Sequence, residues 1–256
     1  MRAVVRPLAI GFTALALLAP PQGPPIVPTL GEAGKSQLQL GEELFAANCV
    51  RCHGIAGRGR ITGDRSLLAP PLRQAGERAA DFYLRTGYMP LADSRDQPLR
   101  SRPRFSERQL RALITYVGSL AVNGPAVPRP HPEAAGVARG RELFTSHCSG
   151  CHQVVAEGGI MTGAKAPPLD RATPVQVAEA VRIGPYAMPP FSEKAISDKD
   201  LDAIIAYVEY TKNPIDEGGW GIDHLGPFPE GMVTWLIAVV VLVATCMLIG
   251  KRRSQS

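Results

Sequence analysis

Two segments of the chain carry apolar residues at helical spacing. The stripes, at i, i+3, i+4 and i+7, are Leu110, Leu113, Ile114 and Val117 in one segment and Leu201, Ile204, Ile205 and Val208 in the other. Such a stripe predicts an amphipathic helix with one face in a core. Ser106 and Gln109 form the pattern of a capping box, and Ser197 opens the second helix. Gly41 and Gly140, at matching positions upstream, would let an earlier helix approach each of these closely.

Hydropathy also marks both ends of the chain. Residues 232–250 form an apolar run without a formal charge, followed by the basic tail 251–256. At about 1.5 Å per residue this run reaches roughly 28 Å, which predicts a transmembrane helix whose basic tail stays in the cytoplasm. Residues 1–25 place Arg2 and Arg6 before a short apolar core, which is typical of a signal peptide or, if uncleaved, an N-terminal anchor.

Proline-rich stretches divide the rest of the chain. We expect stiff linkers at residues 26–35 and 122–134. They delimit two predicted domains, 36–121 and 135–213, and a juxtamembrane segment, 214–231, leads to the membrane helix. Each domain is so small that an apolar core alone would be marginal.

One five-residue motif occurs in each predicted domain. Cys49-Val50-Arg51-Cys52-His53 returns 99 residues later as Cys148-Ser149-Gly150-Cys151-His152. C-x-x-C-H is a haem-attachment signature, in which two thiols form thioether bonds to one haem and the histidine binds its iron. A single copy is also compatible with half of a zinc site or a redox dithiol. Zinc would need four ligands at each site, and no matching set of further Cys or His exists, so we predict two covalently bound haem c groups.

The cysteines Cys49 and Cys52 would attach one haem, and Cys148 and Cys151 the other. Each haem would also complete the core of its small domain. Attachment of this kind needs free thiols outside the cytoplasm, which agrees with export of both domains.

A methionine follows each motif at the same distance. Met89 and Met188 are also 99 residues apart, and each precedes a proline. Methionine opposite histidine fills the second axial position of a haem iron and raises its potential. We therefore expect His53 with Met89, and His152 with Met188, as the axial ligand pairs.

The sequence Ala-Pro-Pro-Leu lies between motif and methionine in both copies, at 69–72 and 166–169. A ligating imidazole usually donates its second N–H to an acceptor that fixes the ring. The carbonyl groups of Pro70 and Pro167 are candidate acceptors, and a plain rigid turn is the alternative.

The two copies differ after the methionine. Ser106 lies 17 positions after Met89, whereas Ser197 lies nine positions after Met188. The extra residues fall within the arginine-rich stretch 90–104. We favour a solvated loop there, and a loop that docks on a partner is the alternative.

Composition adds little. The net charge is +5, but three of the positive charges are Lys251, Arg252 and Arg253 in the tail. The remaining excess does not indicate a nucleic-acid partner.

In its motifs and their order, the chain resembles the dihaem cytochrome c subunit of bacterial quinol–cytochrome c reductase, the respiratory cytochrome bc complex. The resemblance covers nearly everything after residue 36, including both C-x-x-C-H motifs, the methionine loops 87–90 and 184–189, and the lead-in 218–231 to a single C-terminal helix. It implies a mainly α fold, with two tandem class I cytochrome c-like haem domains and one transmembrane helix.

The resemblance also implies partners: a cytochrome b subunit, a Rieske iron–sulfur subunit and a haem–copper cytochrome c oxidase. Quinol is oxidised at cytochrome b in that family, so no catalytic residue is assigned here. This chain would be the electron-transfer subunit of a proton-translocating oxidoreductase. It would carry electrons from the Rieske centre to the oxidase on the extracytoplasmic side of the cell membrane.

Two other functions remain open. The chain is also compatible with an independent membrane-anchored dihaem electron carrier, or with a catalytic dihaem enzyme such as a peroxidase or a sulfur-compound dehydrogenase. A catalytic enzyme needs an open or unusually ligated iron, and a candidate methionine in each copy argues against it.

Overall fold

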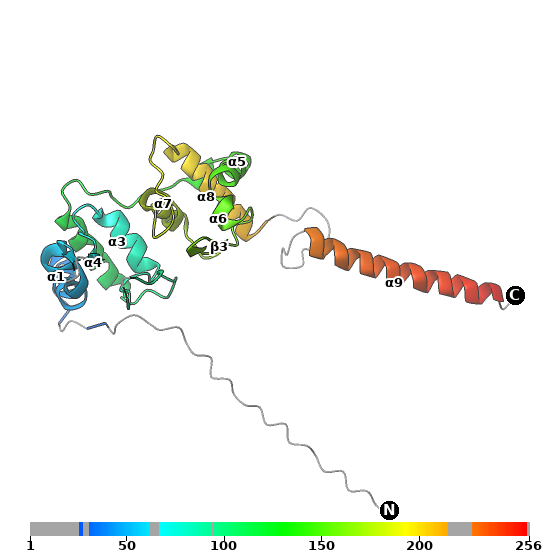
Figure 1. The fold of residues 1–256 in the computed structure, drawn as a ribbon, viewed down its shortest axis with the longest axis horizontal. Coiled ribbons are helices and arrows are strands. Elements are labelled where there is room, and N and C mark those ends of the chain that lie inside the picture. The colour runs from blue at the N-terminus through cyan, green and yellow to red at the C-terminus, as the bar shows by residue number, and fades with distance from the viewer. Residues whose placement is uncertain (1–25, 28–30, 62–66, 94, 215–226, 255–256) are drawn as a thin grey trace, which may run out of the picture. The chain divides into compact units, whose positions relative to one another are not determined.

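The computed structural model describes residues 26–27, 31–61, 67–93, 95–214 and 227–254 (Figure 1). The predicted signal peptide or anchor, most of the juxtamembrane segment and the last two residues of the tail lie outside these ranges. The chain separates into two compact units, residues 1–208 and 209–256. Helices dominate both units, so the fold is mainly α, as predicted.

The first unit contains two similar sets of elements, which we call the first and second repeat. The first repeat consists of α1 (Gln37–Asn48), α2 (Val50–His53), the 3₁₀ turn η1 (Ile55–Gly57), β1 (Arg60–Ile61), β2 (Leu67–Ala69), α3 (Gly76–Arg85) and α4 (Glu107–Leu120). Both α1 and α3 pack on α4, and β1 and β2 pair antiparallel. The core takes Leu40, Leu44 and Phe45 from α1 and the predicted apolar stripe from α4.

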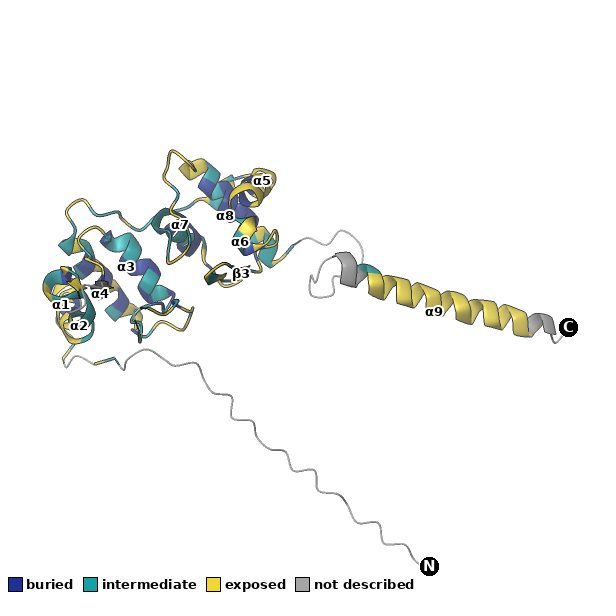
Figure 2. Cartoon of the chain, viewed as in Figure 1, coloured by how far each residue is buried: buried dark blue, intermediate teal, exposed yellow. Residues whose placement is uncertain are grey.

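A second 3₁₀ turn, η2 (Pro132–Ala134), precedes the second repeat. That repeat consists of α5 (Val137–His147), α6 (Ser149–His152), β3 (Gly159–Met161), β4 (Ala164–Ala166), α7 (Pro174–Ile183) and α8 (Asp198–Lys212). The strands form an antiparallel hairpin in which Ile160 pairs with Lys165. The core of the second repeat combines Phe144 of α5 with the predicted apolar stripe of α8. The faces of these helices that form the core are buried (Figure 2).

Glycine lets the first and last helices of each repeat touch. A Cβ atom on Gly41 would overlap the carbonyl oxygen of Ala112, and one on Gly140 would overlap that of Ala203. Both backbones therefore approach to a distance that only glycine permits, which confirms the expected close contacts.

The predicted helix starts are also confirmed. Ser106 Oγ accepts a hydrogen bond from the Gln109 amide, and the Gln109 side-chain oxygen accepts one from the Ser106 backbone N–H. Ser197 Oγ accepts from the Asp200 amide at 3.1 Å. Each cap satisfies amide groups that the first turn of a helix leaves without partners.

Helix α9 (Pro227–Ser254) forms most of the described part of the second unit. Residues Gly231–Lys251 have a mean hydropathy of 2.7, and this span is long and apolar enough to cross a membrane. Nearly every side chain described in it is exposed (Figure 2). An exposed apolar helix of this length fits a bilayer better than water.

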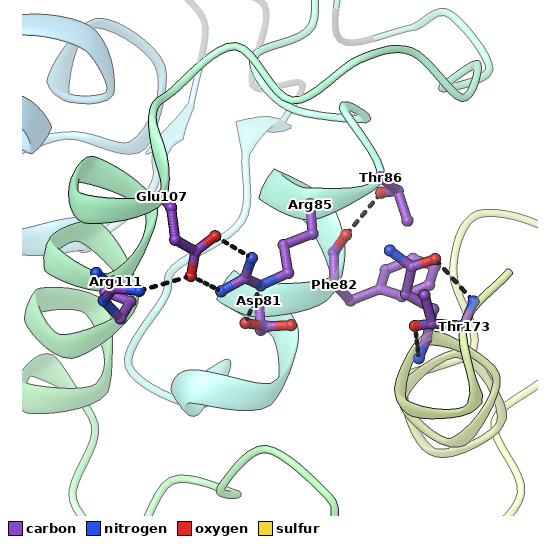
Figure 3. A network of polar contacts seen from close by, with 8 residues as sticks. Asp81, Phe82, Arg85, Thr86, Glu107, Arg111 and Thr173 are labelled. Carbon is purple, nitrogen blue, oxygen red and sulfur yellow. Dashed lines mark hydrogen bonds and ion pairs between the residues drawn. The ribbon is translucent and has the colours of Figure 1, made fainter. Parts of the chain in front are cut away.

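The two repeats meet through α3 and α7. On α3, Arg85 donates to Asp81 at 2.7 Å and also binds both carboxylate oxygens of Glu107 in α4 (Figure 3). On α7, Glu179 is fully buried, and its carboxyl group lies beside that of Asp81 on α3.

Candidate haem-binding sites

Both C-x-x-C-H motifs fold into the same short turn. The amides of Cys52 and His53 donate to the carbonyl of Cys49 at 3.1 and 2.9 Å. The corresponding bonds to the carbonyl of Cys148 have the same two lengths. The preceding helix, α1 or α5, ends at the first cysteine, and the second cysteine and the histidine lie in the short helix that follows, α2 or α6. The repeated motif thus produces a repeated local structure.

The histidine rings are oriented by proline carbonyls. Nδ1 of His53 lies 3.0 Å from the carbonyl oxygen of Pro70, and Nδ1 of His152 lies 3.1 Å from that of Pro167. Both predicted contacts are therefore confirmed. A carbonyl can only accept, so Nδ1 carries the proton and Nε2 is left with a free lone pair. Burial lowers the pKa of both histidines, which favours this neutral form at pH 7.

A largely apolar cavity in the second repeat brings the predicted site residues together. Its wall includes Cys148, Cys151, His152 and Met188, joined by apolar side chains such as Phe144. An imidazole nitrogen and a thioether sulfur are the axial donors of electron-carrying haem iron, and the apolar wall suits a porphyrin. These residues fit a haem.

The corresponding residues of the first repeat lie against its core. Cys49, Met89 and Leu72 are partly buried and pack on the cluster that contains Phe45 and Leu113. The Met89 amide donates to the Tyr83 carbonyl at 3.0 Å, which ties the methionine loop to α3. His53, whose ring contacts the Pro70 carbonyl, is the counterpart of His152 in this repeat.

The other interpretations of C-x-x-C-H fit less well. Within the described residues, no group of three or more Cys, His, Asp or Glu side chains is placed to hold a metal ion. Burial is the main factor that raises the pKa of the Cys49 thiol to about 12 and that of Cys148 to about 11. A redox dithiol needs a lowered thiol pKa, so these cysteines do not resemble one.

Several residues of the first repeat line the cavity of the second, which the sequence alone did not indicate. They are Phe82, Thr86, Tyr88, Gln97, Pro98 and Arg100. Met161 of β3 also lies in this wall. The one available signal was the extra length of the stretch 90–104.

That stretch is only partly the solvated loop we favoured. Arg95 is exposed and pairs with Asp93 at 2.6 Å. Gln97 and Arg100, however, form hydrogen bonds to the second repeat. The loop thus docks within the chain, because these side chains reach acceptors on β4 and α7.

Family models match both repeats. The model described as cytochrome c matches residues 38–121, and that described as cytochrome c oxidase, cbb3-type, subunit III matches residues 135–208. Two cytochrome c-type domains are therefore present, and such domains carry covalently bound haem c.

Relatives extend the similarity over most of the chain. The chain is 35% identical to the cytochrome bc1 complex cytochrome c subunit of Corynebacterium diphtheriae, covering 96% of this chain and 92% of that protein. It is 33% identical to the subunit of the same name from Mycobacterium tuberculosis, over 89% and 82% of the two chains. Similarity to the cbb3-type cytochrome c oxidase subunit CcoP of Azospirillum is lower, at 28% identity over 66% and 60%.

The order of two cytochrome c domains and one apolar C-terminal helix agrees with the resemblance drawn from the motifs. Because the match to the Corynebacterium subunit spans nearly the whole of both chains, this protein belongs to the family of cytochrome c subunits of the cytochrome bc1 complex.

Proposed function

We propose that this chain holds two haem c groups and carries electrons from the Rieske iron–sulfur subunit of a cytochrome bc1 complex to a terminal oxidase. The attachment residues are Cys49 and Cys52 in the first domain, and Cys148 and Cys151 in the second. His53 with Met89, and His152 with Met188, would supply the protein ligands to the two irons. The observation that carries this proposal is the cavity whose wall contains Cys148, Cys151, His152 and Met188.

A bound haem supplies one-electron redox chemistry at its iron. The protein residues hold and orient it. The Pro167 carbonyl keeps the His152 ring in the tautomer that can bind iron. Met188 would supply a second ligand to the same iron, which would leave no ligand position for a substrate. This donor set supports electron transfer over a catalytic dihaem enzyme.

The partners follow from the family. Relatives named as bc1 complex subunits support an assembly with a cytochrome b subunit and a Rieske subunit, in which quinol is oxidised on cytochrome b. The similarity of the second domain to a cbb3-type oxidase subunit supports a haem–copper oxidase as electron acceptor. The apolar helix with its basic end supports a single-pass anchor with both haem domains on the extracytoplasmic side.

Purification in a mild detergent through a C-terminal tag tests this function. We expect b-type haem, the Rieske subunit and oxidase to co-purify with two c-type haems per chain, and the untagged strain serves as the control. Recovery of the dihaem chain without b-type haem or Rieske protein would instead favour an independent carrier. Stable high-spin iron at one site would favour a catalytic enzyme.

A further inference from the structure

The cavity of the second repeat is completed by the first. Tyr88, next to the candidate ligand Met89, lies in its wall together with Phe82. The rings of Phe82 and Tyr88 contact edge to face, with their centroids 5.6 Å apart. The loop that would hold one iron therefore forms part of the site of the other.

Two side chains of the longer loop fasten this contact. The Gln97 amide donates to the Lys165 carbonyl at 2.6 Å, and its oxygen accepts from the Lys165 amide at 3.0 Å. Arg100 donates to the Arg171 carbonyl and to Gln176, both at 2.8 Å. Pro98, between them, is buried. Gln97 thus satisfies backbone groups of β4 in the way that a neighbouring strand would.

The charge of the cavity wall has one sign. Among the described residues, its members include Arg100 and Lys165 but no Asp or Glu. A haem carries two carboxylate groups, which would otherwise bring negative charge into an apolar site. A half-buried guanidinium is always charged and binds carboxylates in a planar, bidentate manner.

We propose that the loop around Gln97 and Arg100 is a clamp between the two domains, and that Arg100 contributes a fixed positive charge to the site of the second haem. The clamp holds Tyr88 and Phe82 in the shared wall, which gives electrons a fixed protein contact between the two sites. This inference rests on the proposed function, because it assumes that both haems are bound.

Redox titration of the purified, haem-loaded chain tests the charge. Positive charge beside a haem disfavours the oxidised iron, so Arg100→Met should lower one midpoint potential and leave the other unchanged. We expect about a tenfold change in the oxidised-to-reduced ratio, which is about 59 mV for one electron. Arg100→Lys should restore most of the shift, and Arg95→Gln, in the exposed part of the loop, should titrate as wild type.

A second variant shows which of the two midpoint potentials belongs to which haem. Met89→His should move the potential of the first site only. A shift that follows the first site, or no shift with Arg100→Met, would overturn the role of Arg100. Haem is counted on each sample beforehand. Fewer than two haems in the wild-type chain would refute the proposed function, whereas two haems with unchanged potentials would refute only this inference.

Hydrogen exchange tests the clamp independently of redox behaviour. The Lys165 amide donates to the side chain of Gln97, so Gln97→Ala should speed its exchange, while Arg95→Gln should not. Equal exchange of this amide in wild type and Gln97→Ala would show that the two domains are not docked in this manner.

Discussion

Nδ1 of His152 lies 3.1 Å from the carbonyl oxygen of Pro167, as Nδ1 of His53 lies 3.0 Å from that of Pro70. The acceptor is a backbone group in both repeats, so the ring orientation depends on the path of the chain and not on a second side chain. Proline fixes its own backbone φ angle, which makes this path rigid. The two candidate iron sites are thus built by the same local device.

Replacement of the candidate axial methionine should change the spin state of one haem. Met188→Ala should leave one site high-spin, because alanine offers no sulfur donor, and Met188→His should stay low-spin but lower one potential. Optical spectra and redox titration measure both effects. Met161→Leu is the matched control in the same cavity wall and should remain low-spin at both sites. High-spin iron in Met161→Leu, but not in Met188→Ala, would reverse the ligand assignment.

An added methyl group at the helix contact should destabilise the second repeat. In Gly140→Ala the new Cβ would overlap the Ala203 carbonyl, so α5 and α8 must separate. We expect a loss of about 1–3 kcal/mol or more in the free energy of unfolding. Gly136→Ala, where nothing lies within 4 Å of the new Cβ, should cost clearly less in the same thermal unfolding experiment. Equal losses would contradict the close packing.

The buried carboxyl group of Glu179 should make stability depend on pH. Burial, followed by repulsion from Asp81 and a hydrogen bond to it, raises its pKa from 4.5 to about 9, and Arg85 and Arg78 act in the opposite direction. The folded chain therefore keeps a proton that the unfolded chain releases, so this group lowers stability as pH rises from about 4.5 to 9.

Glu179→Gln should remove that dependence. The free energy of unfolding of this variant, relative to that of wild type, should increase with pH across this window, by at most about 1.4 kcal/mol per pH unit. Thermal unfolding of the haem-loaded chain in detergent from pH 5 to 9 measures it, with the exposed Glu157→Gln as the control. Parallel curves for wild type and Glu179→Gln would show that the carboxyl is ionised in the folded chain.

Loss of haem attachment should cost helical structure. A chain with Cys52→Ala and Cys151→Ala would lack one thioether link at each site, and we expect each small domain to need its haem to complete the core. Far-ultraviolet circular dichroism should show reduced helix content and a lower melting temperature. Full native helix content in a haem-free sample would contradict this dependence.

Local features of the sites could be predicted from the sequence. The C-x-x-C-H turn is encoded by consecutive residues, and the proline carbonyls and the methionines repeat at equal or nearly equal spacing. Apolar stripes that follow a serine cap predicted α4 and α8. Gly41 and Gly140 predicted the helices that pack closely against them, α1 and α5. Each of these signals is short-range or is duplicated in the chain.

The shared wall could not be predicted in the same way. Tyr88 and Arg100 belong to one repeat and line the cavity of the other, and this arrangement depends on how α3 packs against α7. An arginine-rich loop has the composition of a solvated surface. Its composition therefore did not indicate that part of the loop docks on the second repeat. Glu179 is likewise an ordinary surface residue type, and only the contact between the repeats explains its burial.

The intact mass of the mature polypeptide tests the central claim most directly, since thioether-linked haem survives denaturation. The account predicts the mass of the processed chain plus two haem groups. Replacement of both Cys49 and Cys52 by alanine should remove the mass of one haem, and so should replacement of both Cys148 and Cys151. A wild-type mass with one added haem or none would contradict it.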